Sequence, residues 1–110
     1  IHFTPQGEIL LGGGACTDDH LLRKLPADQR AALRAAGGVY HHTLARSVEL
    51  FAERYRAIFG YCGDALAERI DRAVGFQPTD YRHLLVYFTQ PIDTAHRTRL
   101  IAQAHAVGPF

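Results

Sequence analysis

The 110-residue sequence contains no Met and no Trp, only two Cys, and a single Lys, Lys24, among its basic residues. It also has almost no net charge, because 12 basic residues nearly cancel 11 acidic ones and leave a formal charge of +1. A chain without a strong basic field has no general attraction for nucleic acids or anionic membrane surfaces. Nucleic acid is therefore disfavoured as a partner.

Long apolar runs are absent as well. No run is long enough to cross a bilayer, and no charged-then-apolar segment typical of a secretion signal opens the chain. Cys16 and Cys62 are the only cysteines that could form a disulfide, and a chain with an adequate apolar core does not need a disulfide to be stable. We therefore expect a cytoplasmic protein with reduced thiols and no membrane association. Because the chain starts at Ile1 without a Met, it is expected to be a processed product or an excised domain.

The residues that are present are those of a folded domain. Hydrophobic residues make up 47% of the chain and charged residues 21%, far from the polar bias of disordered segments. A length of 110 residues suffices for one hydrophobic core but not for two. The sequence predicts a single globular domain over residues 1–110.

Turn residues at 5–7 separate two short apolar runs, 1–4 and 8–11, which predicts an N-terminal β-hairpin. Three consecutive glycines, 12–14, are expected to end regular structure there. A short helix capped by Thr17 should follow.

Residues 27–36 are rich in strong helix formers and precede a diglycine, so a second helix is expected. Further along, apolar spacing predicts a helix over 64–74 and another over 94–106, the latter introduced by Pro91 and Asp93. Between them, residues 83–89 are apolar on both faces and typical of an interior strand.

The strongest pattern covers residues 39–59. Apolar residues recur there at steps of three and four, which is the spacing of one helical face, and polar residues occupy the other side. We therefore expect one long helix that ends near Gly60. Its apolar side is broad for so small a domain to cover: Leu44, Val48, Leu50, Phe51, Tyr55, Ile58 and Phe59.

Together these segments predict an α+β fold. The expected domain is helix-rich, with the N-terminal hairpin and the late strand forming a small sheet packed by four to five helices. A helical bundle flanked by a marginal hairpin is the alternative.

Seven histidines invite a search for a metal site, and Cys16, Asp18, Asp19 and His20 offer further ligand types. No spacing matches a metal-binding signature, and the adjacent His41 and His42 would point about 100° apart on a helix. We expect no metal site and no cofactor.

Two other motifs are weak. The triglycine could cradle a phosphate, but Asp18 and Asp19 would occupy the turn where the phosphate sits, and no P-loop sequence follows. Cys62 precedes a helix whose dipole could activate a thiol, yet a small buried side chain is the commoner role of such a cysteine.

One segment resembles the rim of a ligand cleft. Tyr81, Arg82 and His83 lie together at the start of the late strand, and His96 in the last helix could approach them. In an enzyme or ligand-binding domain, His83 or His96 would carry a proton, Tyr81 would donate a hydrogen bond and Arg82 would hold an anion.

Three functional hypotheses follow. We rank first a protein–protein interaction or regulatory domain that forms a homodimer through the apolar side of the 39–59 helix. A small enzyme or ligand-binding domain that uses the histidine site is second. A DNA-binding regulator, suggested by the succession of helix, turn and helix in residues 27–50, is third, because the would-be recognition helix carries Glu49 and Glu53.

Overall fold

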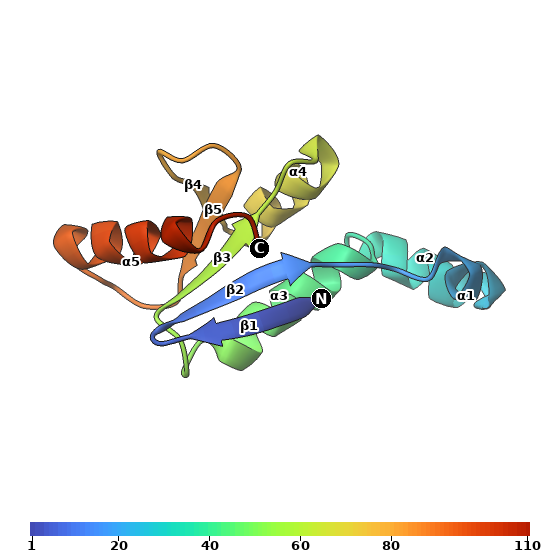
Figure 1. The fold of residues 1–110 in the computed structure, drawn as a ribbon. Coiled ribbons are helices and arrows are strands. Elements are labelled where there is room, and N and C mark those ends of the chain that lie inside the picture. The colour runs from blue at the N-terminus through green and yellow to red at the C-terminus, as the bar shows by residue number, and fades with distance from the viewer.

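A five-stranded mixed β-sheet forms the centre of the computed structural model, which describes residues 1–110 (Figure 1). The strands are β1 (His2–Gln6), β2 (Ile9–Gly14), β3 (Ala57–Tyr61), β4 (Gln77–Pro78) and β5 (Leu84–Phe88). The helices are α1 (Asp19–Lys24), α2 (Ala27–Ala35), α3 (Val39–Phe51), α4 (Ala65–Val74) and α5 (Thr94–Val107). The predicted α+β class is confirmed.

The strand order is β1-β2-β3-β5-β4. Strands β1 and β2 form the predicted antiparallel hairpin, β2 pairs with β3 in parallel, and β5 runs antiparallel to both β3 and β4. Parallel neighbours need a long crossover, and here that crossover contains α1, α2 and α3. The three inner strands are almost wholly apolar because both faces of the sheet are covered.

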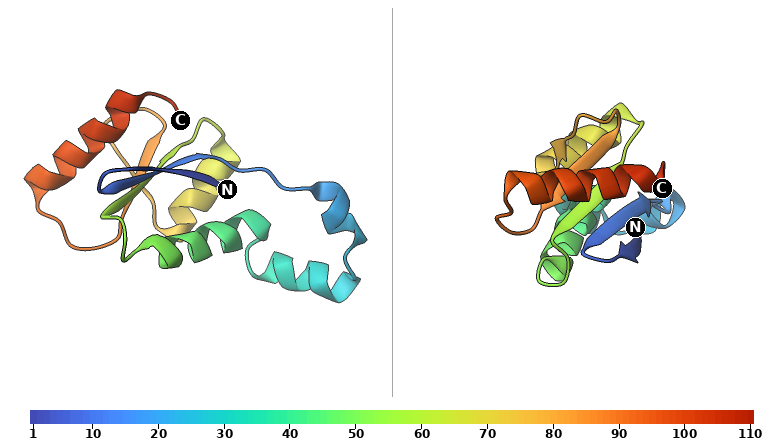
Figure 2. Two further views of the ribbon diagram at one scale, coloured as in Figure 1. Left: turned by 60° about the horizontal axis from the view of Figure 1, so that its bottom comes forward. Right: turned by 60° about the vertical axis from the view of Figure 1, so that its left-hand side comes forward.

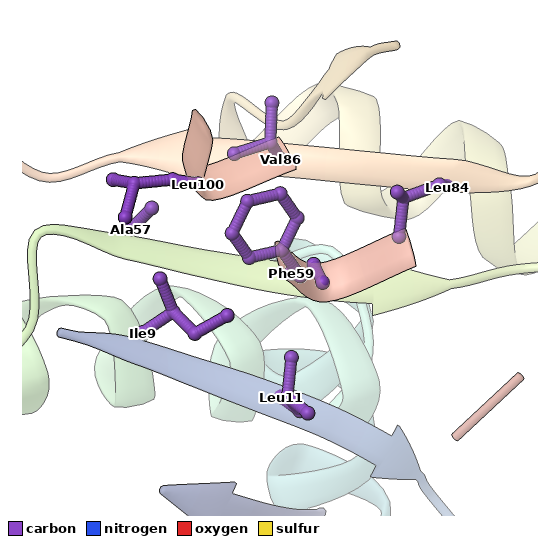
Figure 3. Close-up of a cluster of buried hydrophobic side chains, with 8 residues drawn as sticks. Ile9, Leu11, Ala57, Phe59, Leu84, Val86 and Leu100 are labelled. Carbon is purple, nitrogen blue, oxygen red and sulfur yellow. The ribbon is translucent and has the colours of Figure 1, made fainter. Parts of the chain in front are cut away.

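Each face of the sheet carries its own core. Helix α5 covers one face through Leu100 and Ala104, which pack on alternate residues of the inner strands (Figure 3). Helix α3 covers the other face through Leu44 and Val48, together with partly buried residues of α4. Adjacent strand residues such as Leu10 and Leu11 therefore lie in different cores.

The prediction of a single helix over residues 39–59 was wrong. Helix α3 ends at Phe51, whose carbonyl oxygen accepts from the backbone N–H groups of both Arg54 and Tyr55. The chain then turns, and the N–H of Arg56 donates to the carbonyl oxygen of Glu8 as the sheet begins. Ile58 and Phe59, which continue the helical spacing, belong to β3. This strand lies between β2 and β5 and is buried on both faces, so its residues are apolar without the alternation that marks a half-exposed strand.

The triglycine also differs from expectation, since β2 continues through Gly14. Gly12 faces Gly60 in the parallel pairing, and a Cβ there would lie 3.1 Å from the carbonyl oxygen of Phe59. Glycine thus permits close approach of two strands instead of ending one. The short helix after it is capped by Asp18 rather than Thr17, through a 3.1 Å hydrogen bond from the N–H of Leu21.

Helices α1 and α2 project from the sheet and its covering helices, as Figures 1 and 2 show. We call this segment, Asp19–Ala35 with both helices, the arm. The molecule measures 49 × 26 × 20 Å, and the arm accounts for its elongation. The remaining predicted helices, α4 and α5, lie within two residues of their expected bounds.

Leu100 is fully buried between α5 and the sheet, so Leu100→Ala should reduce the free energy of unfolding by about 2–5 kcal/mol through the cavity it leaves. Leu66→Ala on α4 is the matched control, because Leu66 is 56% exposed and its truncation should cost about 0.5 kcal/mol or less. Urea denaturation of both variants measures the difference. Equal losses would contradict the placement of α5 as core.

Candidate functional site

The structure separates the residues of the predicted histidine site. Tyr81, Arg82 and His83 precede β5, whereas His96 lies in the first turn of α5, after β5 has crossed the sheet. At about 3.3 Å per residue, the five residues of β5 place the two groups at opposite ends of the sheet. The expectation that His96 approaches residues 81–83 was therefore wrong.

His105, in the last turn of α5, takes the place expected for His96. Because α5 runs back along the sheet, its C-terminal end returns to the start of β5 (Figure 1). The rings of Tyr81 and His105 stack there with centroids 3.6 Å apart and an interplanar angle of 10°. Arg82 is exposed, and His83 adopts a left-handed backbone conformation with φ 66°. Tyr81 and His105 are both exposed, so they form a surface stack.

His96 belongs to a polar cluster at the opposite end. Its Nε2 atom lies 3.2 Å from Oε2 of Glu8, and Arg56 Nε lies 2.7 Å from the other carboxylate oxygen of Glu8. These pairs join the β1–β2 turn to the starts of β3 and α5. Both Glu8 and Arg56 are well exposed, so solvent screens the ion pair and its contribution to stability is small.

The predicted interaction surface is mostly core. Of the seven residues assigned to it, Leu44, Val48, Tyr55, Ile58 and Phe59 are buried, and Phe51 packs partly against the core. Only Leu50, 69% exposed, remains on the outside of α3. The broad apolar side that the sequence suggested is therefore divided between α3, which covers the sheet, and β3, which is part of it.

A pocket of about 300 Å³ opens where β2 and β3 end. Since these strands are parallel, their C-terminal ends meet at one edge of the sheet, the usual position of ligand crevices in open sheets. Tyr40 of α3 and Asp71 of α4 close the pocket from the helix layer, and Cys62 lies beside them after β3. Sequence reasoning did not identify Tyr40 or Asp71.

Asp71 is the only buried charged residue in the protein, with 4% of its surface exposed. The hydroxyl of Tyr40 donates a 2.8 Å hydrogen bond to its Oδ1 atom. Its Oδ2 atom lies 3.6 Å from the position that a Cβ on Gly60 would occupy, so the glycine leaves room in front of the carboxylate. The chain thus holds a carboxylate at the inner wall of a pocket.

Burial controls the ionisation of this group. Loss of solvation raises the pKa of Asp71, against the opposing effect of the Tyr40 hydrogen bond. Burial and the adjacent carboxylate raise the pKa of Tyr40 well above its usual value, which keeps its phenol protonated as a donor. Burial also raises the pKa of Cys62, whose thiol donates a 3.4 Å hydrogen bond to the carbonyl oxygen of Asp64. Cys62 is therefore a thiol near neutral pH and not an activated nucleophile.

A signal for Asp71 exists in the sequence. Ala67, Asp71 and Val74 follow one another at steps of four and three, so they share a helical face. The sequence also permits a stripe of Leu66, Ile70 and Val74, but the structure leaves Leu66 exposed and turns Asp71 inward. The sequence therefore permits two buried faces for this helix, and packing selects the one that contains Asp71.

No three His, Cys, Asp or Glu side chains are gathered in a way that could hold a metal ion. Cys16 is exposed and Cys62 is buried, and the two are not bonded to each other. None of the helices has the length and hydropathy that crossing a bilayer requires.

The arm is the second notable feature. Neither α1 nor α2 contains a buried residue, and α2 contacts the start of α3. Leu21 is 59% exposed, while Leu22, Leu25 and Leu33 are only partly covered. The arm therefore presents apolar side chains that its own chain does not cover.

Comparison with known proteins finds no match to a protein-family model, to a curated protein or to a solved structure.

We expect Asp71→Asn to raise the free energy of unfolding at neutral pH by about 1 kcal/mol, an ordinary size for one substitution. The amide keeps an acceptor for Tyr40 and removes a carboxylate that burial disfavours. A raised pKa means that the folded protein binds this proton more tightly than the unfolded chain. The native protein should therefore lose stability as the pH rises from about 3.9, the usual pKa of Asp, through the raised pKa of Asp71.

Chemical denaturation across this pH range compares the two proteins. Their stabilities should converge at low pH, where the carboxyl group is protonated in both the folded and the unfolded state. Asp80→Asn, which removes an exposed carboxylate, should follow the native protein throughout. An Asp71→Asn protein that is less stable than the native one at neutral pH would show that the charge itself supports the fold.

Proposed function

We propose that the protein is an interaction domain that associates with a second copy of itself through the arm. The observation that carries the proposal is the lack of any buried residue in α1 and α2. Helices of 6 and 9 residues are marginal in water when nothing packs against them. Their stability must come from burial of their apolar side chains, which one copy does not supply.

The apolar residues of the arm are arranged for such burial. Leu21 and Leu25 are four residues apart in and just after α1, so they lie along one side of it. Leu22 and Leu33 line a shallow hollow between the two helices, and Leu25 lines a second one with Leu33. Two such helix pairs can cover each other as a four-helix bundle, and a two-fold axis closes the contact without leaving a free surface.

The charges of the arm also favour a second copy over a strongly charged partner. Both signs are interspersed on it, so it has no single-sign field that would attract DNA or an acidic protein. Its basic residues are Arg23, Lys24, Arg30 and Arg34, and its acidic residues with the cap are Asp18, Asp19 and Asp28. A surface of mixed sign can meet its own copy without strong repulsion.

The self-association suggested by the sequence is thereby retained but assigned to another element. The 39–59 segment cannot supply a broad apolar surface, because most of its apolar residues form the core. Leu50 on α3 and Leu21 on α1 are both exposed. A substitution at each therefore distinguishes association through α3 from association through the arm.

We expect Leu21→Glu to weaken self-association at least about tenfold, because a carboxylate would have to be buried in the contact between arms. Leu50→Glu on α3 is the matched control and should leave the association constant unchanged. Sedimentation equilibrium over a range of protein concentrations measures both variants and the native protein. Hydrogen exchange should show amides of the arm gaining protection as the native protein associates.

Two outcomes would contradict the proposal. A native protein that stays monomeric at millimolar concentration would exclude self-association as its function. Dissociation caused by Leu50→Glu, with Leu21→Glu unaffected, would place the contact on α3.

A further inference from the structure

The pocket holds a buried carboxylate without a counter-ion. Asp71 is buried, yet it takes part in none of the ion pairs of the protein. The hydroxyl of Tyr40 donates to its carboxylate, and neither this phenol nor the nearby thiol of Cys62 carries a charge. Buried carboxylates are costly unless a positive group accompanies them, so this site lacks the partner that its charge requires.

The charged side chains of the pocket in front of Asp71 are both acidic, which disfavours an anion there. Asp64 and Asp71 are the only charged side chains that line it, and no Lys, Arg or His side chain does. Asp64 caps α4 by accepting from the N–H of Ala67 at 2.8 Å and is exposed, so solvent screens its charge, whereas Asp71 is buried. Asp71 is thus the carboxylate that remains for a ligand.

The other walls of the pocket are apolar and aromatic. Leu44 and Phe76, which belong to the core on the α3–α4 face, line it together with Tyr40. Aromatic faces attract cations through their quadrupole and also cover apolar groups. A volume of about 300 Å³ is at the lower end for small-molecule sites, which limits the ligand to a compact molecule.

We propose that this pocket binds a small organic cation, an ammonium group carried on an apolar body, with the Asp71 carboxylate as its counter-ion. The ammonium group occupies the space in front of Gly60, where Oδ2 of Asp71 is free of the Tyr40 hydrogen bond. The hydroxyl of Tyr40 holds Oδ1 and orients the carboxylate toward the ligand. The apolar body lies against the aromatic walls. This site is separate from the arm contact, and its occupant does not depend on self-association.

Calorimetric titration with 2-phenylethylamine at about pH 8, where an alkyl amine is still protonated, tests the proposal. The neutral isostere 2-phenylethanol and the anion 3-phenylpropionate serve as ligand controls of similar size. We expect the amine to bind at least tenfold more tightly than the alcohol, and the carboxylate not to bind. Asp71→Asn should weaken amine binding at least tenfold, whereas Asp80→Asn, which alters a carboxylate outside the pocket, should leave it unchanged.

A second variant tests the position of the ammonium group while keeping the charge. Gly60→Ala adds a methyl group at ordinary contact distance from Asp71, so the fold should tolerate it while the space for the ligand shrinks. Amine affinity should fall at least threefold. Equal binding of the amine and the alcohol, or amine binding that survives both Asp71→Asn and Gly60→Ala, would overturn the proposal. Circular dichroism of each variant confirms that loss of binding is not loss of folding.

Discussion

The pairing of β3 with β2 on one side and β5 on the other is the constraint on which the rest of the structure depends. Strand β3 is buried on both faces, and residues Ala57, Ile58 and Phe59 have no exposed surface. Because β3 is parallel to β2, the chain between them must cross from one end of the sheet to the other. The crossover contains the arm, which extends away from the sheet, and α3, which packs on one face of the sheet. The same pairing brings two strand ends to one edge, where α4 and its buried carboxylate close a pocket.

The two faces of the sheet have different roles in this arrangement. The α5 face is a continuous apolar core with no buried charge, and the Phe110 ring near the chain end packs against Tyr61 at its border. The α3–α4 face is more polar at its edge, where Tyr40, Cys62 and Asp71 meet. Both faces thus have an apolar core, and the α3–α4 face also accommodates a charged group that folding alone does not favour.

Local sequence signals predicted those elements whose pattern had a single interpretation. The hairpin, α2, α4 and α5 each had a turn or a cap that fixed their limits, and the structure agrees with them. Strand β3 was missed because Tyr55, Ile58 and Phe59 continue the helical spacing of α3, and only the gap between β2 and β5 decides between helix and strand. The prediction that His96 approaches Tyr81 was wrong for a similar reason. The direction in which α5 crosses the sheet places His105 near Tyr81 instead. Asp71 was overlooked because the rotation of α4, which exposes Leu66, is set by packing against α3 and the sheet and by no local motif.

The arm leaves and rejoins the body at the rim of the pocket. Gly14, Ala15 and Thr17, which lead into the arm, and Tyr40, which follows it, all line the same cavity. A molecule in that cavity would therefore contact the segments of chain that precede and follow the arm. By thermodynamic reciprocity, if pairing of two arms changed the affinity of the cavity for its occupant, the occupant would change the pairing constant by the same factor. The crossover therefore connects the two proposed sites, because a shift of the residues that line the pocket would reach the chain at both ends of the arm.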